Sequence, residues 1–178
     1  MKKKSEEIKY WVVSDTHFGH EKIKEYCGRP DGFEEIVFEN LKKIPEDCYL
    51  IHLGDIAFGN TVEHHEKYIA PLKCKKILVR GNHDKKSRDW YLTHGWDAVF
   101  LSGELRVVTD NGKMVIFSHD KISPEKGLEY SYNVFGHYHN KWPILNEKQI
   151  LFSLESEGYK AVLLNELIDI KNKENESR

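Results

Sequence analysis

The chain has 178 residues, of which 39% are hydrophobic and 31% charged, and its formal net charge is −2. These values exclude an intrinsically disordered chain and predict a single globular domain over residues 1–178, with frayed tails at about 1–8 and 171–178. The near-neutral charge also argues against a protein that holds long nucleic acid through its overall electrostatic field.

The start of the chain and its cysteines predict a cellular location. The charged segment 1–7 is followed by no long apolar stretch, so the sequence predicts neither an export signal nor a membrane span. The three cysteines, Cys27, Cys48 and Cys74, are widely spaced and include no Cys-x-x-Cys pair. This spacing predicts reduced thiols in a cytoplasmic protein rather than a disulfide framework or a thiolate zinc site.

Five short apolar runs are typical of β-strands, and each is followed at once by residues that can bind a metal ion. The runs are 10–14, 49–53, 77–80, 114–118 and 132–135. The residues that follow them are Asp15-Thr16-His17, Gly54-Asp55, Gly81-Asn82-His83-Asp84, His119-Asp120 and Gly136-His137-Tyr138-His139. A single motif of this kind carries little weight, but five in one chain, each at the end of a strand, exceed coincidence.

Apolar residues at helical spacing fill the gaps between the first strands, and they predict helices at 33–44, 61–70 and 85–94. Asp31 is the expected N-cap of the first of these helices, and Gly95 is the expected end of the third. Because strands alternate with helices here, the first half of the chain is predicted to form a parallel sheet.

Turn signals replace helices in the second half of the chain. The Asn-Gly turn at 111–112 predicts a hairpin between strands at 105–108 and 114–117. Two final strands are expected at 149–154 and 159–164. Hairpins favour antiparallel pairing, so the whole chain is predicted to be a mixed α/β sandwich. In such sheets ligands bind beyond the carboxyl ends of the strands, which places the five motifs along a common edge.

The residue types in the motifs indicate a particular class of metal. Mixed imidazole, carboxylate and amide ligands suit Mn, Fe, Zn or Ni better than the all-oxygen sites of Ca or Mg. Asp15 with His17, and His137 with His139, are spaced so that each pair shares one side of an extended chain. Two ions about 3.5–4 Å apart can share a carboxylate and a hydroxide. With only Asp15 and Asp55 to offset two dications, the site would attract an anionic phosphate.

Taken together, the motifs resemble the calcineurin-like metallophosphoesterase family. Its pattern is Asp-x-His, Gly-Asp, Gly-Asn-His-Glu/Asp, His and then Gly-His-x-His, and every element is present between Asp15 and His139. The resemblance implies a four-layer α/β/β/α sandwich, in which two mixed β-sheets are flanked by helices, and a pair of divalent transition-metal ions. The short chain is similar to the compact bacterial, archaeal and phage members.

The family pattern also implies a role for each motif residue. By position, Asp15, His17, Asp55 and His139 would hold one metal. The other would be held by Asp55, Asn82, His119 and His137, with Asp55 bridging the two. His83 matches the histidine that binds no metal, contacts phosphate and protonates the leaving group. The reaction implied is in-line attack on phosphorus by a hydroxide bound at the dinuclear centre.

One position departs from the pattern of some relatives. Phosphoprotein phosphatases carry a second aspartate three residues after the Gly-Asp aspartate, and this chain has Phe58 there. The partner that orients His83 is therefore open, with Asp84 as a candidate that could also contact substrate. His20 is a second candidate for substrate contact, although it could equally cap the following helix. His65, in a predicted helix, is expected to be exposed to solvent.

The resemblance predicts a hydrolase of phosphate mono- or diesters, with nucleotides and nucleic acids among the candidate substrates and no membrane partner. A nuclease or a cyclic-nucleotide phosphodiesterase could use the same metals, because specificity resides in the loops. A nuclease predicts a basic groove beside the metals. The alternative from another class is a non-catalytic metal-binding scaffold, and the complete ligand set with His83 argues against it.

Overall fold

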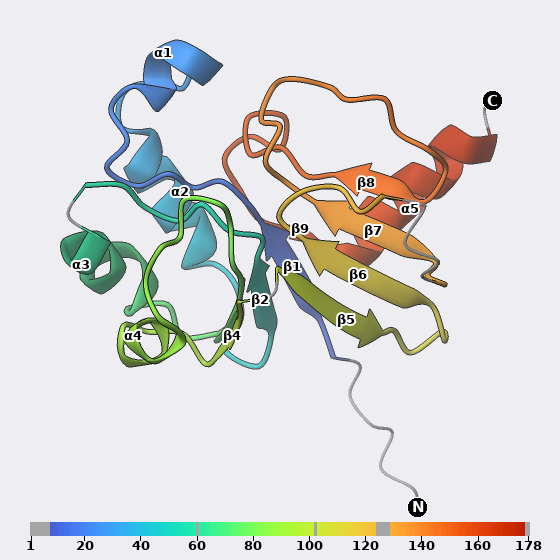
Figure 1. Ribbon diagram of the computed structural model, residues 1–178, viewed down its shortest axis with the longest axis horizontal. Helices are drawn as coiled ribbons and strands as arrows, with labels where there is room; N and C mark the ends of the chain where they lie inside the picture. Colours follow the sequence, from blue (N-terminus) through green and yellow to red (C-terminus); the bar gives the residue numbers. More distant parts are fainter. Residues whose placement is uncertain (1–7, 60, 102, 124–128, 177–178) are drawn as a thin grey trace, which may run out of the picture.

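Two β-sheets face each other with helices on the outside of the molecule (Figure 1). The structure is a computed structural model that describes residues 8–59, 61–101, 103–123 and 129–176, so all but the last position of the predicted N-terminal tail lies outside it. The predicted α/β architecture, with two mixed sheets flanked by helices, is confirmed. No helix within these residues combines the length and the apolar character needed to cross a lipid bilayer.

The first sheet is mostly parallel, as the alternation of strands and helices predicts. In spatial order it contains β4 (Ala98–Phe100), β3 (Lys75–Val79), β2 (Tyr49–His52), β1 (Tyr10–Val13) and β9 (Val162–Leu163). Strands β1 to β4 are parallel neighbours, and β9 runs antiparallel to β1. Strand β4 has no counterpart among the predicted strands. Because β1, β2 and β3 run the same way, the residues that follow them lie at one edge of the sheet.

The second sheet is more parallel than predicted. Its strands, in spatial order, are β5 (Glu104–Val108), β6 (Met114–Ser118), β7 (Tyr132–Phe135) and β8 (Gln149–Leu151). The predicted hairpin of β5 and β6 is confirmed, but β6–β7 and β7–β8 pair in parallel, so the expected antiparallel pairing is wrong there. The connections 119–131 and 136–148 each reach the length of about a dozen residues that a parallel crossover needs.

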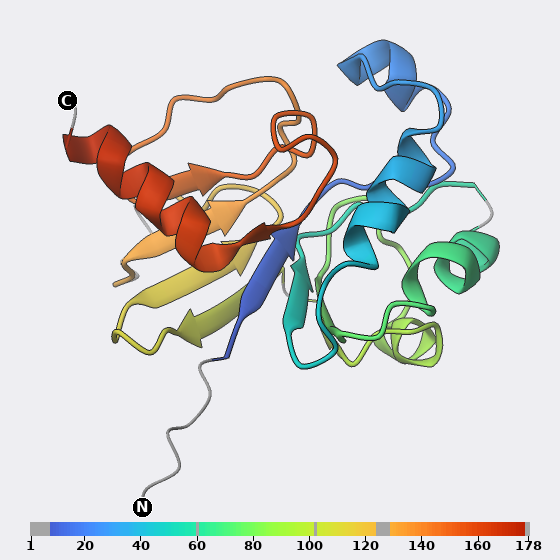
Figure 2. The ribbon, with the colours of Figure 1, turned by 180° about the vertical axis from the view of Figure 1, so that it is seen from behind.

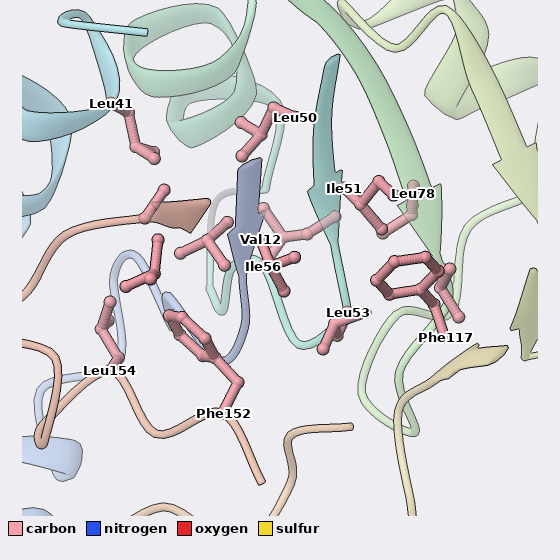
Figure 3. Close-up of a cluster of buried hydrophobic side chains, with 14 of the residues drawn as sticks. Val12, Leu41, Leu50, Ile51, Leu53, Ile56, Leu78, Phe117, Phe152 and Leu154 are labelled. Atoms are coloured by element: carbon pink, nitrogen blue, oxygen red, sulfur yellow. The ribbon is translucent and has the colours of Figure 1, made fainter. Parts of the chain in front are cut away.

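The core lies between the two sheets. Figure 3 shows Val12 and Ile51 from the first sheet in the same buried cluster as Phe117 from the second and Phe152 just beyond it. All four side chains are fully buried. Burying side chains of this size stabilises a fold by roughly 1.5–3 kcal/mol each. This packing therefore holds the two sheets, and the motif loops at their ends, in a fixed relative position.

The helices cover the outside of this core. They are α1 (Ile23–Cys27), α2 (Phe33–Leu41), α3 (Thr61–His64), the π-helix η1 (His65–Ile69), α4 (Arg88–Thr93) and α5 (Leu164–Glu176). Helices α2, α3 and α4 lie on the side of the first sheet that faces away from the second (Figure 1), and α5 crosses the opposite side of the molecule (Figure 2). The first sheet therefore separates the early helices from the second sheet.

The three predicted helices form with altered bounds. Helix α2 ends at Leu41, and its N-cap is Gly32, whose left-handed backbone (φ 72°) takes the place expected for Asp31. The helix predicted at 61–70 is divided between α3 and η1. Helix α4 begins later than predicted, after Ser87, whose side-chain oxygen caps its first turn. Apolar spacing thus locates these helices, and the local capping groups decide where they begin and end.

The polar C-terminal stretch is helical. Because α5 extends to Glu176, the frayed tail predicted from residue 171 is wrong for 171–176. Leu164, Leu167 and Ile168 pack into the core at helical spacing, and even Lys171 is only 3% exposed. A helix with so few apolar residues is stable here because its buried face rests on β8 and β9.

His65 is buried rather than solvated, which corrects the prediction made for it. Its ring packs against Trp90 and Trp96 at centroid distances of 4.9 and 6.4 Å, and its Nδ1 donates to the carbonyl oxygen of Thr61 (2.7 Å). Burial lowers the pKa of His65 to about 4. The helix was expected to expose this face, but the π-turn of η1 and the tryptophans of the α4 region enclose it.

Acid is expected to destabilise the metal-free protein partly through His65. The unfolded chain takes up a proton near the ordinary pKa of 6.5 and the folded chain only near 4, so the free energy of unfolding falls as the pH drops through this window. The slope due to one such group is at most about 1.4 kcal/mol per pH unit. Urea unfolding of His65→Phe in the presence of a chelator should show a shallower pH slope than the wild type. Equal slopes would contradict this assignment.

Candidate metal centre

The structure brings the seven predicted metal ligands together at one edge of the paired sheets. Each follows the carboxyl end of a strand, as open α/β sheets favour for ligand sites. They are Asp15 and His17 after β1, Asp55 after β2, Asn82 after β3, His119 after β6, and His137 and His139 after β7. Strands from both sheets therefore contribute.

One group of ligand atoms consists of Asp15, His17 and His139. Asp15 Oδ1 lies 3.7 Å from His17 Nε2 and 3.8 Å from His139 Nε2, and all three ligand atoms lie within 4.8 Å of one another. His17 Nε2 is also 3.8 Å from Asp55 Oδ2. The space between these atoms is of a size that one cation could fill.

A second group lies beside the first. Asp55, His119 and His137 have ligand atoms within 4.8 Å of one another. Asp55 Oδ2 lies 3.5 Å from His119 Nε2, which in turn lies 3.1 Å from His137 Nδ1 and 2.8 Å from Asn82 Oδ1. Asp55 Oδ2 thus faces His17 of the first group as well as His119 of the second. This is the position expected of a bridging carboxylate.

The buried atoms of the site fit divalent transition-metal ions. Asp15 Oδ1 and His17 Nε2 are buried, and neither has a hydrogen-bond partner among the described residues. Buried polar atoms are normally paired, because leaving one unpaired costs about 1–3 kcal/mol. A cation between them would satisfy both. The mixed nitrogen and oxygen donors suit Mn, Fe, Zn or Ni.

The backbone at the ligands is held in an uncommon conformation. Non-glycine residues rarely adopt positive φ, and each such residue costs on the order of 1–3 kcal/mol. The described residues other than glycine with positive φ are Asp15, His17, Asp55, His137, His139 and Tyr159. All but Tyr159 are predicted ligands. Because the strained residues are concentrated at the site, contacts elsewhere in the fold must compensate the energetic cost of their backbone conformation.

Two glycines allow the loops to approach closely. A Cβ atom at Gly136 would overlap Ser14 Oγ and Asp15 Oδ2, so no side chain fits between the β7 loop and the β1 loop. A Cβ atom at Gly81 would overlap the backbone nitrogen and side chain of Asp55. The glycines of the Gly-Asn-His-Asp and Gly-His-x-His motifs therefore serve the contact between loops rather than flexibility.

The protonation states of the candidate ligands favour the binding of a cation. Burial opposes ionisation of Asp15, yet the nearby imidazoles of His17, His119 and His139 hold the pKa of this carboxyl below its usual value. Burial lowers the pKa of His17 to about 4 and raises that of Asp55 to about 6. The imidazole of His17 is thus neutral and keeps a lone pair for a metal. Metal binding should displace the proton of Asp55, so affinity should rise with pH.

His83 and His20, the candidate substrate residues, both face Phe58. The His83 side chain is 48% exposed, and its Nε2 lies 3.9 Å from Asp55 Oδ2. The Phe58 ring lies 4.7 Å from that of His83 and stacks on His20 at 4.2 Å. His20 Nδ1 lies 3.2 Å from His17 Nδ1, so His20 reaches the first group of ligands. An aromatic contact thus occupies the place where phosphoprotein phosphatases carry a carboxylate.

Asp84 does not contact the substrate region, which corrects its candidate role. Its carboxylate is buried and accepts hydrogen bonds from the backbone nitrogens of Asp55 (2.8 Å), Gly81 (2.8 Å) and Ile56 (3.2 Å). It therefore fastens the loop after β2 to the loop after β3. The motif alone could not show these contacts, because two of the three amides belong to the loop after β2.

Asp84→Asn should loosen both loops. An amide offers one oxygen acceptor where the carboxylate offered two, and its NH₂ group would face backbone N–H donors. We expect a loss of about 2–4 kcal/mol in the free energy of unfolding, measured by urea denaturation of the metal-free protein. Asp89→Asn, at the exposed start of α4, is the matched control and should remain close to the wild type. Equal stability of Asp84→Asn and wild type would contradict the fastening role.

Sequence reasoning missed a buried ion pair behind the ligands. Arg29 Nε and Nη2 donate to Glu155 Oε1 at 2.9 and 2.8 Å, and the same oxygen lies 3.3 Å from His139 Nδ1. Burial opposes ionisation of Glu155, but His139 and Arg29 lower its pKa to about 2. Neither residue belongs to a motif, and 126 positions separate them in the sequence. No local signal could have paired them.

A cleft of about 490 Å³ opens above the ligand groups. Its volume falls within the range of about 300–1,000 Å³ typical of small-molecule sites. Its lining combines predicted site residues with new aromatic and polar ones. These are His17, His20, Ile23, Tyr26, Cys27, Asp55, His83, His137, Tyr138, His139, Asn140 and Lys141.

Known proteins are similar to this chain in sequence or in fold. The crystal structure of the protein of unknown function AQ665 from Aquifex aeolicus matches with a TM-score of 0.72 at 24% identity, covering 92% of this chain and 99% of that one. The uncharacterized protein MJ1445 of Methanocaldococcus jannaschii is 25% identical over 180 residues, which cover 93% of this chain and 92% of that protein. The sequence model of the calcineurin-like phosphoesterase family matches residues 8–174 of this chain. The chain therefore belongs to the calcineurin-like phosphoesterase family.

Proposed function

We propose that this chain hydrolyses phosphate mono- or diesters with the help of two divalent transition-metal ions. The observation that carries the proposal is the pair of ligand groups that meet at Asp55. In the first group, Asp15 Oδ1 and His17 Nε2 are buried without a hydrogen-bond partner in the described part of the chain. Membership in a phosphoesterase family supports the same reaction.

Each ion would have its own ligand group. Asp15, His17 and His139 would hold one ion, and Asn82, His119 and His137 the other, with Asp55 facing both. When bound, the ions would supply Lewis-acid stabilisation of the phosphate charge and lower the pKa of water. The protein fixes these ligands through buried hydrogen bonds, such as those from Ser14 Oγ and from the His137 backbone nitrogen to Asp15 Oδ2, at 2.5 and 2.8 Å. Such fixed ligands need no reorganisation during the reaction.

His83 is proposed to protonate the leaving group. Its backbone nitrogen donates to Asp55 Oδ1 (2.9 Å), which ties the residue to the ligand that faces both groups. Its half-exposed ring lines the cleft and rests against Phe58. A histidine held in this way can reach an ester oxygen that a bound phosphate presents to the cleft.

The lining of the cleft favours a small phosphate ester, such as a nucleotide, over a long nucleic acid. Within the described lining, Lys141 is the one lysine or arginine, so the basic groove that a nuclease needs is not built there. Tyr26 and Tyr138 offer aromatic surface for the organic part of an ester.

A metal and substrate survey tests the proposal. The metal-free protein would be loaded separately with Mn, Fe, Zn and Ni, its metal content measured by mass spectrometry, and each form assayed with p-nitrophenyl phosphate, bis-p-nitrophenyl phosphate, cyclic nucleotides and oligonucleotides. We expect two ions per chain and turnover of a small mono- or diester. Failure to hydrolyse any ester with any of the four metals would contradict the proposal, and metal binding without hydrolysis would favour the non-catalytic metal-binding scaffold. Preferential cleavage of oligonucleotides would support a nuclease instead.

A further inference from the structure

The ion pair of Arg29 and Glu155 lies behind the first ligand group. The side chain of Arg29 is fully buried and that of Glu155 is 10% exposed. Burying two charges is unfavourable unless they are well paired and their remaining hydrogen-bonding groups are satisfied. Here the guanidinium nitrogens of Arg29 and both carboxylate oxygens of Glu155 form hydrogen bonds, and several of their partners belong to the first ligand group or its loop.

Glu155 connects to the ligand His139. Glu155 Oε1 lies 3.3 Å from His139 Nδ1, while His139 Nε2 lies 3.8 Å from Asp15 Oδ1. A carboxylate at Nδ1 requires the proton to be on that nitrogen, which leaves the lone pair of Nε2 directed to the ligand group. Such a contact fixes both the tautomer and the orientation of a metal-binding histidine. The other oxygen of Glu155 accepts a hydrogen bond from Ser153 Oγ (3.1 Å).

Arg29 connects the same carboxylate to the loop after β1. Its Nη1 donates to the carbonyl oxygen of Thr16 (2.9 Å), and its Nη2 donates to that of Asp15 (2.7 Å). These carbonyls lie in the segment where Asp15 and His17 have positive φ, 54° and 51°. One guanidinium therefore stabilises the strained loop that carries two ligands. Glu155 also balances the charge of Arg29, which would otherwise repel a cation.

We propose that Arg29 and Glu155 are positioning residues for the first metal ion, with Glu155 setting the tautomer of His139 and Arg29 fixing Glu155 to the Asp15 loop. This inference rests on the proposed metal centre. The contacts of the pair go to Asp15, to Thr16 between Asp15 and His17, and to His139. A change in the pair should therefore weaken the first ion much more than the second.

Glu155→Gln in the full chain tests the selectivity. The metal-free protein would be titrated with Zn²⁺ by calorimetry, and the ¹⁵N chemical shifts of the His17 and His119 ring nitrogens, which report direct coordination, would assign each binding step. We expect affinity at the first site to fall about 10- to 100-fold, the usual effect of removing the partner of a metal-binding histidine, and affinity at the second site to stay within about two-fold of the wild type. Glu157→Gln, in the same loop but beside a different groove, is the matched control.

A spectroscopic measurement separates positioning from general destabilisation. In the metal-free wild type, ¹⁵N chemical shifts should show His139 protonated at Nδ1, and Glu155→Gln should reduce the population of this tautomer. Ser153→Ala removes the hydrogen bond to the other carboxylate oxygen, together with the long one (3.4 Å) that Ser153 Oγ accepts from the Ser156 backbone nitrogen, and it should shift both readouts in the same direction by a smaller amount. If Glu155→Gln fails to fold, this milder variant decides.

Two results would overturn the inference. One is equal weakening of both sites, and the other is an unchanged first site with an unchanged His139 tautomer in the variants that fold. If the variants behave in this way while the wild type binds two ions and hydrolyses esters, the positioning role alone is wrong. A wild-type protein that binds neither Zn²⁺ nor Mn²⁺ and hydrolyses nothing would overturn the proposed function and, with it, this inference.

Discussion

Asp55→Asn should abolish the dinuclear centre. Asp55 Oδ2 lies 3.8 Å from His17 Nε2 and 3.5 Å from His119 Nε2, so this one oxygen faces both ligand groups. Asparagine keeps the size of the side chain but removes the negative charge that two dications would share. Since metals supply several kcal/mol of transition-state stabilisation, turnover should fall by at least about 1,000-fold.

The measurement combines metal content by mass spectrometry with hydrolysis of bis-p-nitrophenyl phosphate in the presence of Mn²⁺. Less than two bound ions per chain is expected for the variant at metal concentrations that saturate the wild type. Asp110→Asn, at the exposed turn after β5, makes the same chemical change away from the site and should behave as wild type. Full metal content with full activity in Asp55→Asn would rule out the bridging role.

His83→Ala should separate catalysis from metal binding. Its ring lines the cleft, and its side chain is half-exposed, so its removal leaves the ligand groups intact. We expect both ions to remain bound while turnover falls about 100- to 10,000-fold, the usual contribution of a general acid. The loss should be larger for an alkyl phosphate ester than for a p-nitrophenyl ester, because the poorer leaving group depends more on protonation.

Comparison of the two esters distinguishes the proposed role from simple phosphate binding. A histidine that only bound phosphate would produce the same loss for both leaving groups. His94→Ala removes a histidine that stacks on Trp90 at 3.9 Å rather than lining the cleft, and it should leave turnover unchanged. Unchanged turnover of His83→Ala would remove His83 from the mechanism.

Much of the site could be predicted from the sequence because every candidate ligand lies a few residues after the end of one of five apolar runs. The run before Asp15 or Asp55 is recognisable from its apolar residues alone, and the rule that ligands gather at the carboxyl ends of strands then places the motifs at one edge. The structure indeed brings Asp15, Asp55 and His139 there. For the same reason the parallel strands of the first sheet were predictable, since their alternation with helices is visible along the chain.

What only the tertiary structure decided depends on residues that are distant in sequence. Asp84 follows His83 in its motif, yet three backbone amides hold its carboxylate away from the cleft. His65 belongs to a polar segment but is enclosed by two tryptophans, and parallel pairing in the second sheet arises through long crossovers. Local propensity cannot report such contacts, because their energy exists only once the partners have been brought together.

The amino-acid sequence by itself determined which chemical groups the candidate site offers: imidazole, carboxylate and amide groups, their order and their places at the ends of strands. The tertiary structure decided how these groups are supported, through the ion pair of Arg29 with Glu155, the positive φ of five candidate ligands and the glycines that let the loops meet. The physical reason is that the chemical type of each side chain can be read from its own position in the sequence. Burial, charge balance and backbone strain are properties of many residues acting at once.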